Sequence, residues 1–416
     1  MSHKKLESRV LNVRQTIIYN FSLNVQKHWY PSRVNGSFDN FTKTIHVSHE
    51  SNFLNHCIKL STRIFFIVCL PFFRLSSSIY QHLATKKNIH KYETVSKINK
   101  KNKNCKLITV GNILVGGVGK TPTVLAITNK LRSEGFNIAV VTKGYAGEKL
   151  NLNNAPEVVP SNMSNPEAAR YFGDEPTLIS RLSSVPVCVA KDRTQAIEYL
   201  VSKHSELNYI IADDGIQSLH QFSEKKILVF DERIMGNGYC LPYGPMREPW
   251  PTPYFIDAVI LNFSEGHKIR QSSLNKILAR DNVGQIFESE LAIKFWENLE
   301  RKRIECNEIK VLSELESKNT KKKVLAIAGI GVPNKFFRTL KSLGLDFDAL
   351  PLNNHERDIN NILAGRLDIS DYGLILTTEK DGVKLTVKNK EIVGKLWKLI
   401  TELHLPDDFY RKLIEE

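Results

Sequence analysis

Cysteine is scarce in this sequence, and its spacing carries no metal-binding signature. The 416 residues include six cysteines, and no two of them form a Cys-x-x-Cys pair. This argues against a disulfide-bonded scaffold and against a structural zinc site. We expect a reduced, cytosol-facing protein with a substantial core, since 42% of the residues are hydrophobic.

A secretory signal and a long uninterrupted apolar run are also missing. Residues 1–50 are polar and carry charges of both signs, so they give a mitochondrial presequence little support. The strongest apolar run, Ile64–Phe73, is bounded by Arg63 and Arg74. It has about half of the ~20 apolar residues that a bilayer-spanning helix needs, and Pro71 is expected to bend a helix there. We therefore predict a segment that dips into one leaflet of a membrane.

Acidic residues are fewer than basic ones in this sequence. Lysine and arginine number 58 against 44 aspartates and glutamates, which gives a formal net charge of +14. This charge predicts an anionic partner: a phospholipid surface, a phosphorylated substrate or a nucleic acid. Between residues 85 and 106, eight lysines accompany one acid, Glu93. Because these lysines follow the apolar run, we favour attachment to an anionic membrane surface. The alternative is a buried core helix followed by a solvated lysine linker.

Beyond residue 106, short apolar runs alternate with longer amphipathic ones, which is typical of a βαβ sheet. We expect a mostly parallel α/β sheet flanked by helices, with a helix over Pro122–Ser133. Buried strands are predicted at Lys106–Val110, Ile138–Thr142, Val185–Ala190, Tyr209–Ala212, Ile227–Phe230, Asp257–Leu261, Val324–Ala328 and Leu374–Thr378.

Changes in composition divide the chain into four predicted regions. They are a poorly ordered N-terminal extension (1–52), a membrane-associated helix with a basic linker (53–106), a nucleotide-binding core (107–310) and a smaller C-terminal α/β domain (311–416). The charged stretch Ser313–Lys323 is predicted to be the linker between the last two. The preceding stretch, Glu290–Lys310, is rich in charge and lacks clear periodicity.

A glycine-rich loop joins the first predicted strand to the first predicted helix. It reads Gly116-Gly117-Val118-Gly119-Lys120-Thr121. Glycines let successive backbone N–H groups turn inward around an anion, and the helix start adds its positive dipole end. We expect a nucleotide here, with Lys120 at its β- and γ-phosphates and the Thr121 hydroxyl on Mg²⁺. Leu114 stands where the usual motif has its first glycine, and the alternative is a glycine turn with an accidental Gly-Lys-Thr.

The apolar run Tyr209–Ala212 ends in two carboxylates, Asp213 and Asp214. In a parallel sheet the carboxyl ends of the strands face the ligand crevice. One of these aspartates is therefore expected to help hold Mg²⁺ near the phosphate loop. The alternative is a turn or a helix cap.

Further motifs follow in an order that nucleotide binding alone does not require. They are Gly173-Asp174-Glu175-Pro176, Gly236-Asn237-Gly238, Leu241-Pro242-Tyr243-Gly244-Pro245-Met246-Arg247-Glu248-Pro249, Gly329-Ile330-Gly331 and Thr378-Glu379-Lys380-Asp381. With the phosphate loop and the paired carboxylates, the sequence closely resembles the tetraacyldisaccharide 4'-kinases, the lipid A kinases, over roughly residues 60–385. The resemblance implies a P-loop NTPase-like fold and transfer of the ATP γ-phosphate to the 4'-hydroxyl of a lipid disaccharide 1-phosphate. It also implies the cytoplasmic face of a bacterial inner membrane, with an organelle of bacterial descent as the alternative location.

The resemblance carries roles to individual positions. The catalytic residues would be Asp174 as the base, His355 as its partner and Lys120. Mg²⁺ would be held by residues from the set Thr121, Glu175, Asp213 and Asp214. The lipid would be bound by Asn237, Arg247 and Glu248. Judged by residue type alone, an ionised Asp174 can take up a hydroxyl proton, or it can cap the helix before Pro176. His355 can equally be an ordinary loop histidine.

Several positions depart from the family pattern. Beside His355, Asn354 replaces an aspartate and Glu356 replaces a histidine. Ser218 stands for the histidine after the paired carboxylates, and Lys143 stands for an arginine, which exchanges a bidentate group for a point charge. We expect these changes to affect rate and acceptor preference and to leave the reaction type intact.

Two other functions are compatible with parts of the sequence. A P-loop ATPase or GTPase switch acting on a membrane or protein partner would also contain the glycine loop and the paired carboxylates, but it has no need of Asp174 or His355. Nucleic-acid binding would use the positive charge, but no helix-turn-helix, zinc-finger or aromatic RNA-binding pattern accompanies it. We expect no nucleic-acid partner, and the sequence indicates no protein partner.

Overall fold

The computed structural model describes residues 24–30, 52–89, 105–152, 155–219, 222–263, 282–320, 322–352, 369–385 and 390–415. These residues form two compact units. Of the described residues, those within 1–90, 113–115 and 233–252 form the smaller unit, and those within 91–112, 116–232 and 253–416 form the larger unit.

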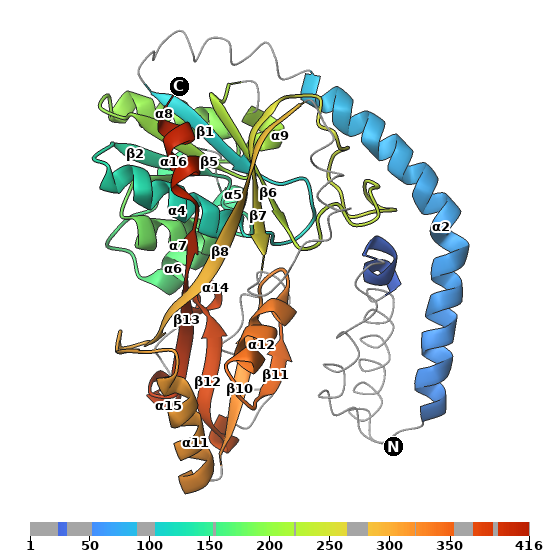
Figure 1. Cartoon of the computed structure of the whole chain (residues 1–416), viewed down its shortest axis with the longest axis vertical. Helices are drawn as coiled ribbons and strands as arrows, with labels where there is room; N and C mark the ends of the chain where they lie inside the picture. The colour runs from blue at the N-terminus through green and yellow to red at the C-terminus, as the bar shows by residue number, and fades with distance from the viewer. Residues whose placement is uncertain are drawn as a thin grey trace. The chain divides into compact units, whose positions relative to one another are not determined.

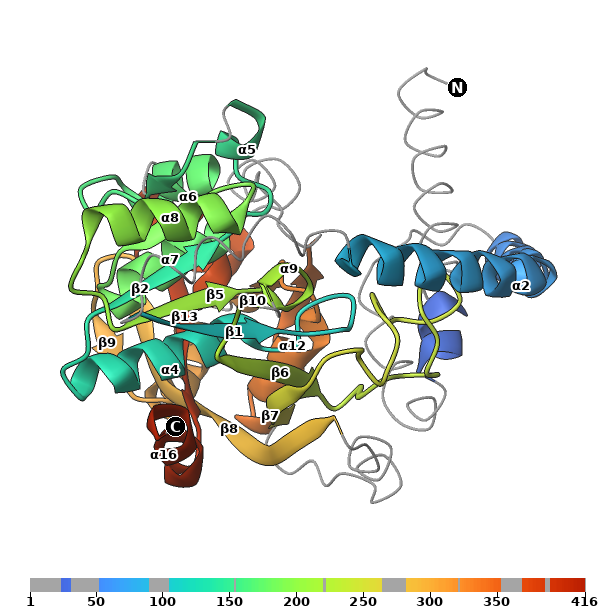
Figure 2. The same cartoon turned by 90° about the horizontal axis from the view of Figure 1, so that it is seen from above.

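The larger unit is built on a 13-stranded sheet of the described residues (Figures 1 and 2). Its order is β11-β10-β12-β13-β8-β7-β6-β1-β5-β2-β4-β3, with β9 paired to β8. The strands are β1 Lys106–Gly111, β2 Ile138–Thr142, β3 Glu157–Val158, β4 Val187–Val189, β5 Tyr209–Asp213, β6 Lys225–Asp231, β7 Ile256–Phe263, β8 Val283–Asn298, β9 Arg303–Ile304, β10 Lys323–Ala328, β11 Asp348–Pro351, β12 Tyr372–Thr378 and β13 Leu396–His404.

Two parallel sets of strands meet in this sheet. The first set runs from β4 to β8, and the second from β11 to β13. They join where β8 and β13 pair antiparallel. Residues 283–290 of β8 pair with β7, and residues 290–298 pair with β13. Figure 1 shows the long β8 passing from one set into the other.

The pairing of β8 fixes where the strands of both sets end. Phe263, the last residue of β7, is paired with Glu290, and so is His404, the last residue of β13. Since the other strands of each set run parallel to β7 or β13, the carboxyl ends of both sets approach the same level of the sheet. Loops that follow these strands are therefore brought together from distant parts of the sequence.

The first set follows the predicted pattern closely. Its central strands are apolar and buried; β2 and β5 are buried at every residue. The helix α4 (Lys120–Ser133) covers one face, and α8 (Arg193–Lys203) covers the other, where Ala196 and Leu200 pack against Val141 (Figure 2). The predicted mostly parallel α/β sheet is confirmed. The remaining helices of this half are α5 Lys149–Leu152, α6 Asn165–Phe172, α7 Asp174–Ser183 and α9 Ile216–Leu219.

The second set corrects the sequence analysis in two respects. The predicted linker Ser313–Lys323 is wrong, because residues 313–320 belong to the helix α11 (Glu308–Thr320) and Lys323 begins β10. The stretch Glu290–Lys310, which shows no clear periodicity in sequence, contains the end of β8, all of β9 and the start of α11. The division expected near residues 310–322 lies inside the larger unit. The remaining helices are α12 Pro333–Ser342, the 3₁₀ helix Ile369–Asp371, α14 Glu379–Gly382, α15 Lys390–Val393 and α16 Asp407–Ile414.

The smaller unit contains the long helix α2 (Asn52–Ile89). It continues through Pro71, and its segment Leu60–Leu83 is long and apolar enough, by length and composition alone, to cross a membrane. The apolar part of this helix is therefore longer than the run Ile64–Phe73 alone, and the dip into one leaflet stays a prediction. The alternative of a buried core helix is wrong, since only 11% of the most apolar window is buried. Of the N-terminal extension, residues 24–29 are helical, while residues 1–23 and 31–51, like most of the lysine-rich linker, lie outside the described residues.

Candidate active site

The phosphate loop lies between β1 and α4, where the sequence predicted it. Gly119 is the N-cap of α4 with a φ of 95°, a conformation that favours glycine. A side chain there would clash, because a Cβ atom would lie 1.7 Å from the amide nitrogen of Asn262. The buried Asn262, near the end of β7, donates a hydrogen bond to the Val118 carbonyl (3.2 Å). Asn262 therefore braces the loop, a role that the sequence analysis missed.

Lys120 is held by residues from two neighbouring strand ends. Its Nζ lies 3.0 Å from Oδ1 of Asn112 and 3.3 Å from Oδ1 of Asp214. Gln217 in turn donates to the backbone carbonyl of Asn112 (2.7 Å). The predicted phosphate-binding lysine and one of the predicted carboxylates therefore lie together. Ser218, which departs from the family pattern, only donates to the Gly215 carbonyl nearby.

Asp213, the last residue of β5, is the more buried of the paired carboxylates. Its Oδ2 accepts a hydrogen bond from the Thr142 hydroxyl (3.3 Å), while Oδ1 is buried and has no hydrogen-bond partner among the residues that the structure describes. Burial, and next the negative charge of Glu175, raise the pKa of Asp213 to about 7. A buried carboxylate oxygen with a raised pKa and no donor is suited to a cation.

The arrangement of these carboxylates suits Mg²⁺ better than it suits a metal ion that is held by protein ligands alone. Among the described residues, no three His, Cys, Asp or Glu side chains converge on one metal position. Mg²⁺ does not require such a cluster, because it is usually held by one or two carboxylates together with phosphate oxygens and water. Oδ1 of Asp213 can serve as such a ligand. It lies near the phosphate loop, because the next residue, Asp214, contacts Lys120 of that loop.

Asp174 and Glu175 begin the helix α7. Gly173, and not Asp174, is the N-cap, so the alternative of a capping aspartate is wrong. Oδ1 of Asp174 accepts the backbone N–H of Glu175 (3.0 Å), and the side chain is only 4% exposed. A buried charge needs compensation, and two lysines that the sequence analysis did not assign supply it: Lys384 at 3.3 Å and Lys380 at 3.9 Å from Oδ2.

The residues expected to bind the lipid lie in the smaller unit. Both ends of the Asn237 amide are used within its own loop, with the Tyr243 carbonyl and the Tyr239 N–H. The backbone of Arg247 donates to the Ile113 carbonyl (2.7 Å) and accepts from the Tyr80 hydroxyl of α2 (3.0 Å). The loop of Arg247 is thereby fixed to the long apolar helix and to residues 113–115, which lead directly into Gly116 in the chain.

Two predicted site residues remain. Glu248 is buried beside Arg247 in the same loop of the smaller unit. His355 lies outside the described residues, as do its neighbours Asn354 and Glu356.

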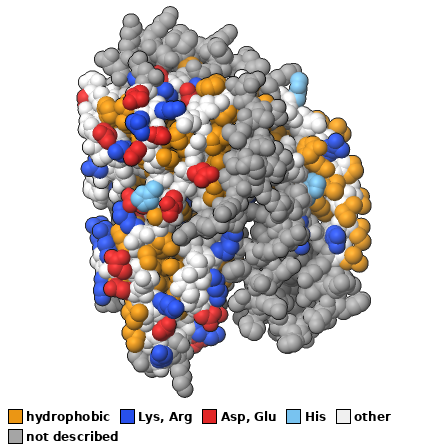
Figure 3. All heavy atoms as spheres, in the orientation of Figure 1, with side chains coloured by type: hydrophobic (Ala, Val, Ile, Leu, Met, Phe, Trp, Pro, Cys, Tyr) orange, Lys and Arg blue, Asp and Glu red, His pale blue; other side chains and the backbone are white. Residues whose placement is uncertain are grey.

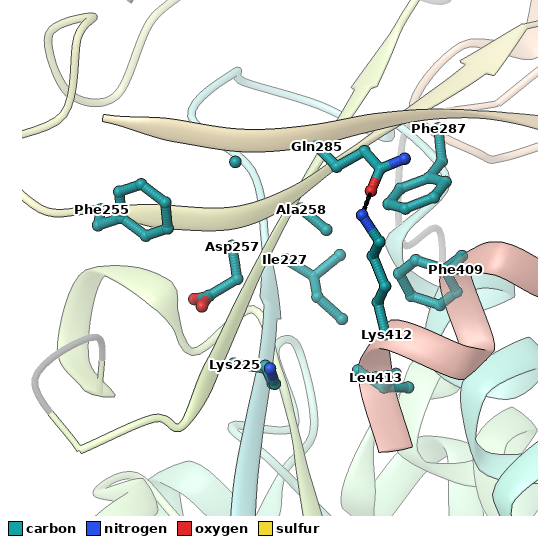
Figure 4. A pocket seen from close by; sticks show the side chains of 11 residues that line it. Lys225, Ile227, Phe255, Asp257, Ala258, Gln285, Phe287, Phe409, Lys412 and Leu413 are labelled. Carbon is teal, nitrogen blue, oxygen red and sulfur yellow. Dashed lines mark hydrogen bonds between the residues drawn. The ribbon is translucent and has the colours of Figure 1, made fainter. Parts of the chain in front are cut away.

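A separate cavity of about 430 Å³ lies at the opposite ends of the strands (Figure 4). It is lined at the starts of β6, β7 and β8 by Lys225, Asp257 and Gln285, and on α16 by Phe409 and Lys412. Because the phosphate loop follows the carboxyl end of β1, which is parallel to β6, this cavity is not the candidate active site.

A glycine loop with its lysine, and carboxylates at the ends of parallel strands, define the class of the protein as a P-loop nucleotide-binding protein of the α/β type. The profile of the LpxK family, tetraacyldisaccharide-1-P 4'-kinase, matches residues 70–416. The chain belongs to this family. It is 32% identical to the tetraacyldisaccharide 4'-kinase of Herminiimonas arsenicoxydans over 74% of this chain and 82% of that protein. The corresponding protein of Dechloromonas aromatica is 33% identical over 74% and 83%.

A solved structure agrees with this fold. A crystal structure of LpxK from Aquifex aeolicus in complex with ATP covers 83% of this chain and 96% of its own, with a TM-score of 0.57 and 21% sequence identity. The fold predicted from the family resemblance is confirmed.

Proposed function

We propose that this protein transfers the γ-phosphate of ATP to the 4'-hydroxyl of a tetraacyldisaccharide 1-phosphate. Family membership supports this function, because the relatives carry the name of that activity. The observation that carries the proposal is structural: the phosphate loop and a buried carboxylate at a helix start, Asp174, belong to one compact unit. A nucleotide switch has no need of the second feature.

The larger unit holds the groups that phosphoryl transfer requires. Such reactions depend chiefly on aligning the phosphate and neutralising its charge. The loop N–H groups and Lys120 would bind the ATP phosphates. Thr121 and Asp213, with Asp214 or Glu175, would hold Mg²⁺, which when bound neutralises the β- and γ-phosphates. Asp174 would accept the proton of the sugar hydroxyl.

The smaller unit would bring the enzyme to a lipid acceptor. One side of α2 bears exposed apolar residues at helical spacing, among them Ile64, Val68, Phe72, Leu75 and Ile79. Figure 3 shows hydrophobic side chains gathered along this helix. The other side is bonded to the protein, where Ser77 donates to the Cys240 carbonyl. An outward apolar stripe suits insertion into one leaflet, which we propose is the cytoplasmic leaflet of a bacterial inner membrane. The Arg247 loop, fixed to the same helix, would meet the acceptor there.

The proposal is tested by the product. The purified full-length chain is incubated in detergent micelles with radiolabelled ATP, Mg²⁺ and a tetraacyldisaccharide 1-phosphate, and the lipid is separated by chromatography. We expect a labelled bisphosphorylated lipid, and no such product from Asp174→Asn, which should still bind ATP. ATP hydrolysis that is unaffected by the lipid would instead indicate a nucleotide switch.

A further inference from the structure

The carboxylate of Asp174 is held from the opposite half of the sheet. Asp174 belongs to the first parallel set, while its nearest ammonium group, Lys384, follows β12 of the second set. Both side chains are buried: Lys384 is 8% exposed and Asp174 is 4% exposed. Their 3.3 Å contact is one of the direct charge contacts between the two sets of strands.

Lys384 is itself fixed by a buried aspartate, Asp381. Oδ1 of Asp381 accepts from the lysine Nζ at 2.9 Å. Its Oδ2 accepts from the Thr378 hydroxyl (2.7 Å) and from the backbone N–H of Gly329 (2.8 Å). Thr378 ends β12, and Gly329 directly follows β10. Asp381 thus ties two strand ends together and presents Lys384 to Asp174.

The loop that follows β10, Gly329–Gly331, also contacts the phosphate loop. Gly331, two residues beyond Gly329, packs so closely that a Cβ atom there would lie 2.5 Å from the backbone nitrogen of Gly117. Gly331 therefore has to be glycine. One rigid group of residues consequently touches the phosphate loop through Gly331 and the Asp174 carboxylate through Lys384.

We propose that Lys384, held by Asp381, is a positioning residue for phosphoryl transfer. It fixes the Asp174 carboxylate relative to the phosphate loop, so that the acceptor hydroxyl and the γ-phosphate are aligned. This inference rests on the proposed function, in which Asp174 takes up the acceptor proton. The neighbouring Lys380 lies closer to Glu175, because its Nζ is 2.8 Å from Oε1 of Glu175 and 3.9 Å from Oδ2 of Asp174.

The competing interpretation is a buried ion pair that only stabilises the fold. The variant Lys384→Arg separates the two, because it keeps the charge and changes the geometry. If the pair only stabilises the fold, the exchange leaves the kcat of the folded enzyme unchanged. If it positions Asp174, kcat falls, since displacing a reacting group by about 1 Å can cost a hundredfold in rate. Lys226→Arg is the matched control: Lys226 also pairs with a partly buried aspartate, Asp257, at 3.3 Å, at the opposite ends of the strands.

Kinetics of the full-length enzyme with ATP and the lipid acceptor test the proposal. For Lys384→Arg we expect kcat to fall by about ten- to a hundredfold, with both KM values within about twofold and unchanged thermal stability. Lys226→Arg should keep the wild-type kcat. Asp381→Asn, which retains two of the three hydrogen-bonding partners, should reproduce the loss. A wild-type kcat in Lys384→Arg, or a loss explained by KM or by unfolding, would overturn the proposal.

A second readout keeps this test separate from that of the proposed function. If the wild-type protein does not phosphorylate the lipid, the proposed function fails. Crystal structures of the wild type and Lys384→Arg then decide the positioning: a carboxylate of Asp174 that has turned or moved in the variant supports it. An unmoved carboxylate refutes it.

Discussion

The two parallel sets of strands end at the same level of the sheet but present different chemistry there. The first set presents backbone N–H groups and carboxylates: the glycine loop after β1 and the aspartates that end β5. The second set presents cations and a glycine loop, Lys380 and Lys384 after β12 and Gly329–Gly331 after β10. Individual groups of opposite charge meet between the two sets, as Asp174 and Glu175 do with Lys384 and Lys380.

This difference indicates how the work is divided. The first set carries the groups expected to contact the nucleotide and the metal ion. The second set carries residues that contact those first-set groups, as Gly331 contacts Gly117 and Lys384 contacts Asp174. Changes in the first set should therefore abolish chemistry, while changes in the second should weaken it. Variants of both sets test this division, and those of the first set should lose the most activity.

Replacing Lys120 should have the largest effect. Lys120→Met removes the loop's side-chain cation, and we expect kcat to fall by about a thousandfold. Lys318→Met, at an exposed position of α11 in the second set, serves as the control and should be active. A Lys120→Met enzyme with more than a tenth of the wild-type rate would remove the phosphate loop from the reaction.

Replacing Asp174 should lower the rate nearly as much. Asp174→Asn keeps the shape of the side chain and loses the proton acceptor, so kcat should fall by about a hundredfold or more. Binding of ATP, followed by calorimetry, should be unchanged. If ATP affinity falls in proportion to the rate, Asp174 belongs to nucleotide binding and not to the acceptor.

The apolar face of α2 should govern membrane binding and not catalysis in detergent. Exchanging Phe65 and Phe72 for serine removes two exposed rings, each worth about 2 kcal/mol when buried in lipid. Sedimentation with phosphatidylglycerol vesicles should show affinity lowered by tenfold or more. Leu152→Ser, an equally exposed apolar residue of the larger unit, is the control. Equal binding by both variants would exclude α2 as the membrane contact.

The raised pKa of Asp213 predicts a pH-dependent gain in stability on its removal. In the folded state its pKa is about 7, against about 3.9 in the unfolded chain. Its ionisation therefore lowers the free energy of unfolding increasingly from about pH 4 to pH 7, and by a constant amount above that. In urea titrations without metal, Asp213→Asn should be more stable at pH 8 by at least about 1 kcal/mol, and less so at pH 5.

The exposed Asp346→Asn provides the baseline for that titration, since Asp346 is solvent-exposed on the second set. It should change stability little at either pH. An Asp213→Asn variant that is less stable than the wild type at pH 8 would show that the aspartate is well compensated without a cation.

The first set was largely predictable because most of its strands are short, apolar and largely buried. The apolar composition of β2, β5 and β7 is enough to predict them as strands. The strand β8 does not, because its burial alternates irregularly as it passes from one set to the other. The helix α11 is charged and largely exposed, so it was mistaken for a linker.

The site was predictable only in part, for a similar reason. Glycines and paired aspartates form local motifs, and they identified the phosphate loop and the carboxylates. Asn262 and Lys384 act across long sequence separations, on Val118 and Asp174, and no local pattern marks them. The motif Thr378-Glu379-Lys380-Asp381 was visible, but its contact with α7 follows from the antiparallel junction of the two sets.

The most direct test is a crystal structure of the protein with Mg²⁺ and a non-hydrolysable ATP analogue. We expect the terminal phosphate at Lys120, Mg²⁺ at Asp213, and the Asp174 carboxylate facing that phosphate with Lys384 still on its Oδ2. A terminal phosphate remote from Asp174, with Lys384 turned away from it, would contradict the account.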